Sequence, residues 1–306
     1  MALTNRSAEL DRSANEQIFS TDDAGPLAAL RDAGRRLLRT RLAGFGLVVL
    51  GLVIFLAIFA GVLAPYNPDS QSLADVLQAP SGAHLFGTDD LGRDILSRVI
   101  YGSRVSLEVG LISVSVALVG GCLIGLVAGY WGGMVDEVLM RAMDALAAFP
   151  ALVLALAITS ALGMGIGNAM IAIGIVYIPA FARLVRGQAL SVRERDYVTA
   201  ARSLGAGHFR IMLRHIWPNV TAPIIVQASL AVGFAIITEA ALSFLGVGVR
   251  PPTASWGSML NEGYQYLENA PWMSVAPGAA IFVTVLGLNL LGDGLRTVLD
   301  PRLSRR

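Results

Sequence analysis

The chain lacks lysine altogether, because all 23 basic residues among its 306 are arginine. A nucleotide-binding P-loop has the pattern GxxxxGK[ST], in which the lysine contacts the phosphates. This chain therefore holds no P-loop, and we expect it to bind no cofactor and to hydrolyse no ATP by that mechanism. If ATP drives the protein, ATP and Mg²⁺ are used by another polypeptide.

Cysteine and histidine are nearly as scarce, which removes further classes of site. Cys122 is the single cysteine, so neither an intrachain disulfide nor a metal site with several cysteines can form. The three histidines, at positions 84, 208 and 215, are widely separated and lack HExxH-type spacing. No GxSxG motif and no basic–aromatic pattern for nucleic acid is evident. The sequence predicts a non-enzymatic protein without metal or nucleic acid.

Charge is also scarce, at 15% of residues against about 25% in soluble domains. A transmembrane helix needs about 20 mostly apolar residues, and the uncharged stretches are long enough for six such helices. The sequence therefore predicts an all-α, polytopic membrane protein. The predicted spans are 42–64, 105–130, two within 142–182 that meet at the turn GMGIGN (163–168), 217–238 and 269–292.

Arginine is distributed unevenly between the two sides of the predicted membrane. With the N-terminus in the cytoplasm, the cytoplasmic segments hold 19 arginines and the external segments hold 4. Because arginine is enriched in cytoplasmic segments, both termini are predicted to be cytoplasmic. The regions are a tail (1–41), a first transmembrane helix (42–64), an external segment (65–104), a five-helix core (105–296) with a cytoplasmic loop (188–219) and an external loop (248–273), and a C-terminal tail (297–306).

The external segment contains GTDDLGRDILSR (87–98), which predicts a further helix. Thr88 or Asp89 could cap it, and apolar residues between 95 and 100 share one face. We expect this helix to lie along the membrane surface, with Arg93, Arg98 and Arg104 toward lipid headgroups. Contact with a partner protein is the alternative.

The stretch 196–219, DYVTAARSLGAGHFRIMLRHIWPN, is a polar loop between apolar stretches. Asp196 can cap a first helix by accepting backbone N–H groups, and Ala200 and Ala201 place two small side chains on it. Gly205 lies where a left-handed C-terminal cap is expected. A second, amphipathic helix follows, and Pro218 is expected to end it. Such a protruding pair of helices is suited to docking another protein.

This loop resembles the EAA motif of ABC-importer membrane subunits. The residues at that family's spacing are Ala200, Ala201, Gly205 and Pro218. Thr199 stands where the family most often has glutamate, and His215 and Trp217 stand where it has isoleucine and leucine. From about residue 40 onward, the chain looks like the C-type permease subunit of dipeptide and oligopeptide importers. The segments that carry this likeness are 84–107, EAALSFLGVG (239–248), PPTASWGSML (251–260) and NLLGDGLRTVLDPRL (289–303).

The resemblance implies the type I ABC-importer permease fold in a bacterial inner membrane. It also implies a second, homologous permease subunit, two cytosolic ATPase subunits, an extracytoplasmic substrate-binding protein and membrane lipid as partners. Dipeptides or short oligopeptides are the implied substrates, and close relatives import glutathione or nickel chelates. In that family the loop is the coupling helix, which seats in a groove of the ATPase. The residues that we assign to it here are Asp196, Thr199, Ala200, Ala201, Gly205, His215 and Pro218.

Two features inside the spans allow a functional and a structural interpretation. Glu239 lies in the fifth span, where a charge costs about 2.5–3.5 kcal/mol at mid-helix. It either lines the translocation route and meets the cationic end of a peptide, or makes a structural hydrogen bond. Gly121, Gly125 and Gly129 share one helix face, so another helix can approach closely. This seam either slides during gating or serves static packing.

Two other classes of protein remain open from the sequence. A stand-alone secondary transporter or channel would work without ATPase partners and usually shows inverted repeats. No such repeat is visible, and the long cytoplasmic loop would be unexplained. A membrane scaffold without transport would not need a glutamate inside the membrane.

Overall fold

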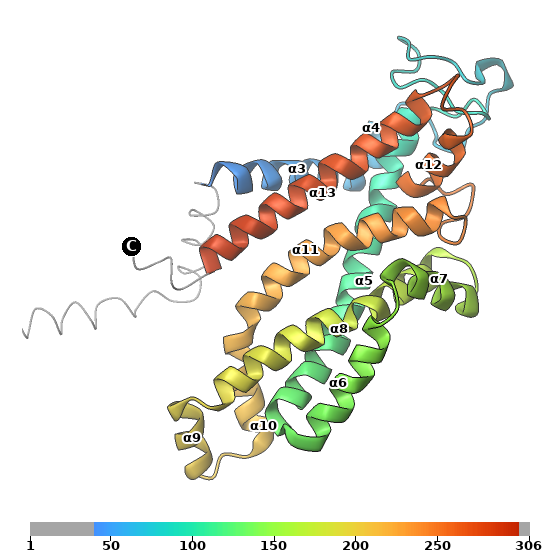
Figure 1. The fold of residues 1–306 in the computed structure, drawn as a ribbon. Coiled ribbons are helices and arrows are strands. Elements are labelled where there is room, and N and C mark those ends of the chain that lie inside the picture. Colours follow the sequence, from blue (N-terminus) through green and yellow to red (C-terminus); the bar gives the residue numbers. More distant parts are fainter. Residues whose placement is uncertain (1–39, 300–306) are drawn as a thin grey trace, which may run out of the picture.

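The computed structural model describes residues 40–299, in which all the regular elements are helices (Figure 1). The segment 65–94 is largely irregular, with one isolated bridge between Thr88 and Asp94. The predicted terminal tails lie almost entirely outside the described residues. The helices are α3 (Arg41–Ile58), α4 (Ala60–Leu63), η1 (Leu73–Asp75), α5 (Ile95–Trp131), α6 (Gly133–Ala147), α7 (Ala151–Leu162), α8 (Ile166–Arg193), α9 (Asp196–Ser203), α10 (His208–Ile211), η2 (Met212–Ile216), α11 (Trp217–Phe244), α12 (Trp256–Tyr264) and α13 (Trp272–Leu299).

The apolar helices correspond to the predicted spans. Among the described residues, α5, α8, α11 and α13 are each long and apolar enough to cross a membrane. Helices α6 and α7 meet this criterion only as a pair, and α3 is a shorter apolar helix. The prediction of an all-α, polytopic membrane protein is therefore confirmed, with six apolar stretches in the predicted order.

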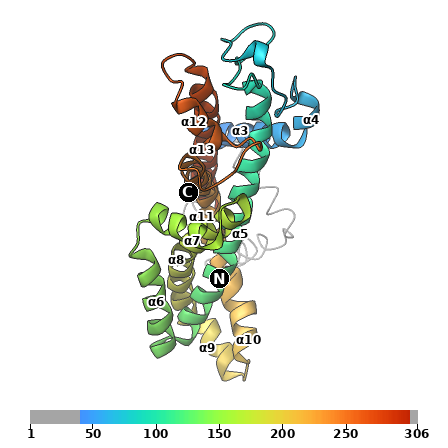
Figure 2. The same cartoon turned by 90° about the vertical axis from the view of Figure 1, so that its right-hand side faces the viewer.

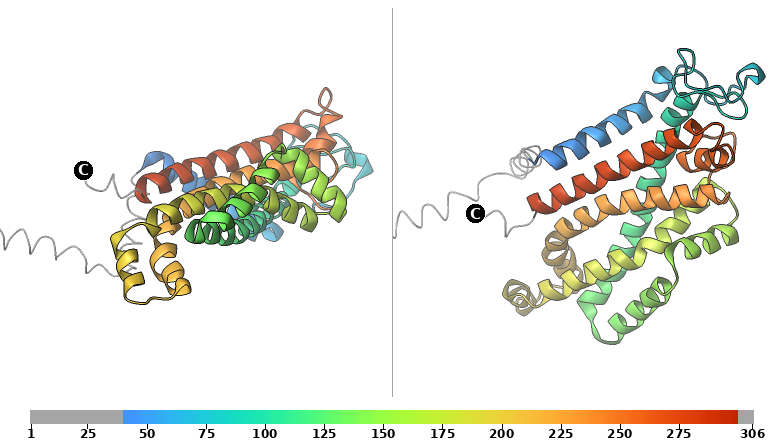
Figure 3. Two further views of the ribbon diagram at one scale, coloured as in Figure 1. Left: turned by 60° about the horizontal axis from the view of Figure 1, so that its bottom comes forward. Right: turned by 45° about the horizontal axis from the view of Figure 1, so that its top comes forward.

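Four helices form a layer that α5 crosses. Figure 3 shows α3, α13, α11 and α8 side by side, with α5 passing behind them and contacting all four. The hairpin of α9 and α10 lies at one end of this bundle (Figure 2). Helix α12 and the segment that precedes α5 lie at the opposite end. We call these the loop end and the α12 end.

The third predicted span differs from the structure. We expected one helix starting just after Arg141, but α6 begins at Gly133 and the chain breaks at Pro150. Helices α6 and α7 are bent by 92° at this break, because proline has no N–H for the preceding turn and is favoured where a helix begins. The turn at GMGIGN is where we predicted it, with φ of +96° at Gly163 and +147° at Gly165.

The glycine seam lies against α8. A Cβ built on Gly121, Gly125 or Gly129 would come closer than 3.0 Å to atoms of α8. At Gly125 the obstacles include the Ala182 carbonyl oxygen and the Arg186 backbone nitrogen, which cannot turn aside as a side chain can. The close approach of α5 to α8 therefore depends on having glycine, which has no side chain, at these three positions.

We expect Gly125→Ala to destabilise the protein by about 1–3 kcal/mol, because the added methyl group forces α5 away from α8. Gly187→Ala is the matched control, since Gly187 also lies in a membrane helix but a Cβ there meets nothing within 4 Å. The melting temperature of the purified protein in detergent compares the two. An equal melting temperature for both variants would contradict the close-contact explanation.

The predicted surface helix in the segment 65–104 is wrong. Helix α5 begins at Ile95 and continues without a break to Trp131, so the apolar face belongs to the bundle. Its cap is Asp94, whose Oδ2 accepts a 2.8 Å hydrogen bond from the Ser97 backbone N–H, rather than Thr88 or Asp89. Arg104 also does not point to headgroups alone, because its Nη2 donates to the Ile58 carbonyl at the end of α3 at 3.1 Å.

Arg93 and Arg98 are buried, with exposed fractions of 3% and 1%. Arg93 Nε donates to Asp89 Oδ2 at 2.6 Å, and Arg93 Nη2 donates to Glu262 Oε2 of α12 at 2.9 Å. Arg98 Nη2 reaches the same Glu262 oxygen at 3.3 Å, and Arg98 Nε lies 3.6 Å from Asp89 Oδ2. We call these four residues the Asp89 cluster. It joins the segment before α5 to α12, which a surface helix could not do.

Candidate functional site

The loop predicted to dock another protein lies between α8 and α11 at the loop end of the bundle (Figure 2). It contains α9, then a glycine turn, then α10 and the π-helical turn η2, which leads directly into α11. The two-helix shape therefore agrees with the prediction, although the second helix is continuous with a membrane span.

The turn between α9 and α10 has the geometry of a Schellman motif. The predicted left-handed conformation of Gly205 is confirmed, with φ of +80°. The Ala206 N–H donates to the Ala201 carbonyl and the Gly205 N–H donates to the Arg202 carbonyl, both at 3.0 Å. These two bonds satisfy carbonyls that the end of a helix leaves free. A Cβ at Gly205 would meet nothing within 4 Å, so only the backbone conformation requires glycine.

Two predicted boundaries of the loop are wrong. Asp196 is the first residue of α9 and Arg195 is the cap residue, with no cap hydrogen bond from a side chain. The carboxylate of Asp196 still favours the helix through the positive end of its dipole. Pro218 does not end the second helix, because it is the second residue of α11. Proline is tolerated in a first turn, where its N–H would lack a helical partner, and η2 supplies the change of register just before it.

Buried apolar side chains hold the loop on the bundle. Val198 of α9, Ile211 of α10 and Ile216 of η2 are fully buried. They belong to one cluster with Tyr130 of α5 and Val192 of α8. The loop therefore rests on the ends of two membrane helices.

Polar contacts reinforce this attachment at Tyr130. The Tyr130 hydroxyl lies 2.7 Å from His208 Nδ1 at the start of α10. Arg193, at the end of α8, donates through Nη1 to the Tyr130 carbonyl at 3.1 Å and to the Gly129 carbonyl at 3.3 Å. The end of α5 is thus hydrogen-bonded to residues on both sides of the loop.

We expect Tyr130→Phe to loosen α10 without unfolding the bundle, because it removes one hydrogen bond worth about 0.5–1.5 kcal/mol and keeps the ring. Hydrogen exchange of residues 206–212 should become faster, while exchange in α13 should not change. Tyr177→Phe is the control, since the Tyr177 hydroxyl contacts Thr238 and neither residue belongs to the loop. The same exchange pattern in both variants would contradict a specific role for the Tyr130–His208 contact.

The outer surface of the loop carries exposed apolar side chains. Leu204 is 88% and Phe209 is 71% exposed, and Thr199 and Ala200 are exposed beside them on α9. Ala201 and His215 are half-buried, and the His215 ring lies 6.3 Å from the Tyr197 ring between centroids. Large apolar side chains exposed at a protruding tip are typical of a protein-binding surface. We call Ala200, Leu204 and Phe209 the docking tip.

Glu239 does not line a surface of this chain. Its side chain is fully buried, and Oε1 accepts a 2.6 Å hydrogen bond from Ser243 Oγ on the same helix. Ser243 Oγ in turn accepts from the Val249 N–H at 3.0 Å. The glutamate is therefore linked through Ser243 to the turn after α11, and the expectation of a wet path or subunit interface finds no support in this placement.

Three carboxylates at the α12 end come close enough to hold a cation. Oxygens of Asp89, Asp90 and Glu262 lie within 4.8 Å of one another. Arg93 lies within 4.0 Å of all three groups, and Arg98 of two of them. The two guanidinium groups supply the positive charge that a cation would bring, so we assign this arrangement to ion pairing.

Sequence reasoning missed Tyr130 and Arg193, which attach the loop, and Glu262, which completes the Asp89 cluster. The four-residue spacing of Asp89 and Arg93 was a usable local signal. Glu262 lies 164 residues after Arg98, so no local pattern could indicate their contact.

Known proteins match this chain along nearly its whole length. A family model described as "binding-protein-dependent transport system inner membrane component" matches residues 121–305. A model of the N-terminal TM domain of oligopeptide transport permease C matches residues 29–80. A dipeptide transport system permease protein of Alkalihalophilus pseudofirmus is 45% identical, covering 89% of this chain and 90% of its own length.

Two further relatives differ in the substrate that their names give. A di/tripeptide transport system permease protein of Pseudomonas aeruginosa is 47% identical over 84% of this chain and 87% of its own length. A glutathione transport system permease protein of Pectobacterium atrosepticum is 46% identical over 89% of this chain and 91% of its own length. Sequence identity alone therefore does not show whether the relatives' peptide or glutathione specificity applies.

Proposed function

The chain belongs to the family of binding-protein-dependent transport system inner membrane components, and on that premise we propose that it forms part of the translocation path of an ATP-driven importer for dipeptides or short oligopeptides. The observation that carries this proposal is the combination of close peptide-permease relatives with the exposed docking tip at the end of a membrane bundle. A second, homologous permease subunit completes the path.

ATP hydrolysis takes place on two cytosolic partner subunits, because this chain has no lysine for a P-loop. The coupling loop, residues 188–219, seats its docking tip in a groove of one ATPase. Closure of the ATPases on ATP moves α9 and α10, and the contacts at Tyr130 pass that movement to α5. The membrane helices then alternate the access of the path between the two sides.

The loop end faces the cytoplasm of a bacterial cell, and the α12 end faces outward toward a substrate-binding protein. The uneven distribution of arginine supports this orientation, because 19 arginines fall in the predicted cytoplasmic segments and 4 in the external ones.

Glutathione is the second candidate substrate, because a glutathione permease is about as similar to this chain as the peptide permeases are. Both candidates are short peptides with free charged ends. Nickel chelates remain a third candidate from the sequence resemblance alone.

Uptake by cells that need an external amino acid tests the proposal. A strain auxotrophic for leucine is compared with and without this gene on a leucine-containing dipeptide, a leucine-containing pentapeptide, glutathione and nickel. We expect growth on the dipeptide to require the gene. If cells without the gene still use the dipeptide but no longer take up glutathione or nickel, then glutathione or nickel is the substrate. Dipeptide uptake that does not need ATP would contradict the assignment to an ATP-driven importer.

A further inference from the structure

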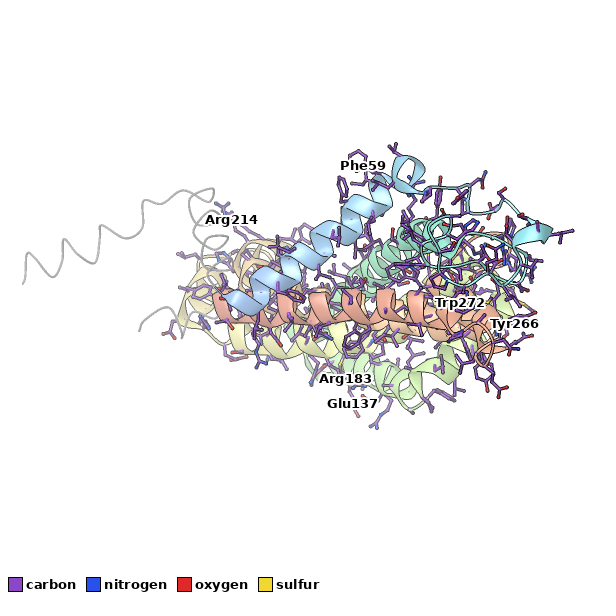
Figure 4. The ribbon with its side chains drawn as sticks, turned by 90° about the horizontal axis from the view of Figure 1, so that it is seen from above. Phe59, Glu137, Arg183, Arg214, Tyr266 and Trp272 are labelled. Carbon is purple, nitrogen blue, oxygen red and sulfur yellow. The ribbon has the colours of Figure 1, made fainter. Side chains whose placement is uncertain are left out.

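The solvent-exposed surface of α6 and α8, on the side of the bundle, carries charges of both signs. Glu137 and Arg141 of α6 are exposed, and neither makes a hydrogen bond or ion pair with the described residues. Asp144 of α6 lies 3.5 Å from Arg183 of α8, and these two side chains are 60% and 50% exposed. Figure 4 places Glu137 and Arg183 on the same edge of the molecule. We call these four residues the charged face.

Part of the charged face lies at the depth of the lipid chains. Helix α8 has 28 residues, which is about 42 Å at 1.5 Å per residue. The hydrocarbon layer is about 30 Å thick, so α8 exceeds it by about 12 Å. Arg183 is about 15 Å from the loop end of α8. Even if the whole excess projects at that end, Arg183 lies about 3 Å inside the edge of the layer, and any smaller projection places it deeper.

Lipid therefore cannot cover the Arg183 end of this face without a penalty. A charged side chain at mid-helix costs about 2.5–3.5 kcal/mol on insertion scales, and intramembrane charges normally face a partner or a water-filled cavity. The apolar helix α3 shows the contrast, since its exposed side chains from Leu42 onward are uncharged, including Val48 at 69% and Phe45 at 51%. The surface of α3 is suited to lipid, and the charged face is suited to water or protein.

We propose that the charged face lines the water-filled passage and holds the two charged ends of a zwitterionic peptide in transit. This inference rests on the proposed function and names residues for it. The carboxylate of Glu137 would receive the peptide amino group, and the guanidinium of Arg141 would receive the peptide carboxylate. Asp144 and Arg183 lie further from the loop end and pair with each other at 3.5 Å, so a peptide would have to exchange with that ion pair.

Charge and spacing favour a zwitterion over a second protein chain as the occupant. Protein interfaces are depleted of unpaired charge at their centre, but Glu137 and Arg141 are both unpaired. Residues four apart on a helix have Cβ atoms about 5–6 Å apart, and a dipeptide in extended form spans about 7 Å. The face has two acids and two arginines, so it favours neither a simple anion nor a simple cation.

Cysteine labelling in the assembled importer tests the passage. Ala145 is exposed next to Asp144, so Ala145→Cys places a thiol on this face and leaves all four charges in place. The native Cys122 is buried at 4% exposure, so the unchanged chain gives the background. A negatively charged methanethiosulfonate should label Ala145→Cys, and a saturating dipeptide should slow labelling about ten-fold or more. Val48→Cys on α3 should react only with an uncharged, membrane-permeant reagent.

The outcomes separate this inference from the proposed function. If Ala145→Cys resists the charged reagent, a partner chain or lipid covers the face and the inference is overturned. Labelling that dipeptide does not slow also overturns it. A second variant, Arg141→Gln, should raise the dipeptide concentration for half-maximal uptake about ten-fold, equal to about 1.4 kcal/mol of binding, while the complex still assembles. If the unaltered importer takes up no dipeptide, it is the proposed function that fails.

Discussion

Replacing Gly205 with valine is expected to abolish coupled uptake while the protein still inserts into the membrane. Gly205 has φ of +80°, where an L-residue with a Cβ loses about 1–2 kcal/mol and a β-branched residue is a marked outlier. That penalty lowers the ratio of native to non-native turn about 5- to 30-fold. Without the turn, α9 and α10 no longer present the docking tip as one surface, so ATP hydrolysis and transport should separate.

The neighbouring glycine provides the control for this experiment. Gly207 has φ of −66° and also has open space around its Cβ position, so Gly207→Ser should retain uptake and add a favourable helix cap. Gly205→Asn should retain part of the activity, because asparagine tolerates the left-handed conformation. Uptake, ATPase activity and membrane insertion are measured for each variant. Normal coupled uptake by Gly205→Val would show that the loop does not need this turn.

Local sequence patterns predicted the features of this fold that depend on single residues or single stretches. Six apolar runs predicted the membrane helices because burial in lipid acts on each run by itself. Gly205 was predicted correctly because a left-handed turn restricts which residue can occupy one position. The glycine series of α5 indicated a close helix contact for the same reason, and α8 is the helix that fills it.

Local sequence patterns did not predict the features that depend on contacts between two segments far apart in the sequence. Arg93 and Arg98 were predicted to face lipid headgroups, which is the usual position for arginine near a membrane. Their burial depends on Glu262 of α12, which supplies a carboxylate at 2.9 Å and 3.3 Å. The prediction for Pro218 failed for a related reason, since the π-helical turn that precedes it buries Met212 and Ile216 in one cluster with residues of α5 and α8, which no local pattern indicates.

Replacing Asp89 with asparagine should destabilise the α12 end by about 3–5 kcal/mol, the usual loss when one partner of a buried ion pair is removed. Asparagine keeps the shape and can still accept the Leu91 and Arg93 backbone N–H groups that Asp89 Oδ1 now binds at 2.9 Å. It leaves the buried Arg93 and Arg98 with Glu262 as their main counter-charge. The segment 65–94 should detach from α12, which limited proteolysis of that segment and the melting temperature in detergent both measure.

Glu262→Gln is the matched comparison and should destabilise the protein less. Burial raises the pKa of the Glu262 carboxyl, and this outweighs the opposite effect of Arg98 and Arg93. A raised pKa means that the fold favours the protonated form, so this contribution to stability is present below the ordinary pKa of glutamate and is lost as the pH rises through the raised value. Glutamine resembles the protonated form, so the loss of stability between these two pH values should disappear in Glu262→Gln. If Glu262→Gln proves as destabilising as Asp89→Asn at neutral pH, the ionised Glu262 holds the arginines as strongly as Asp89 does.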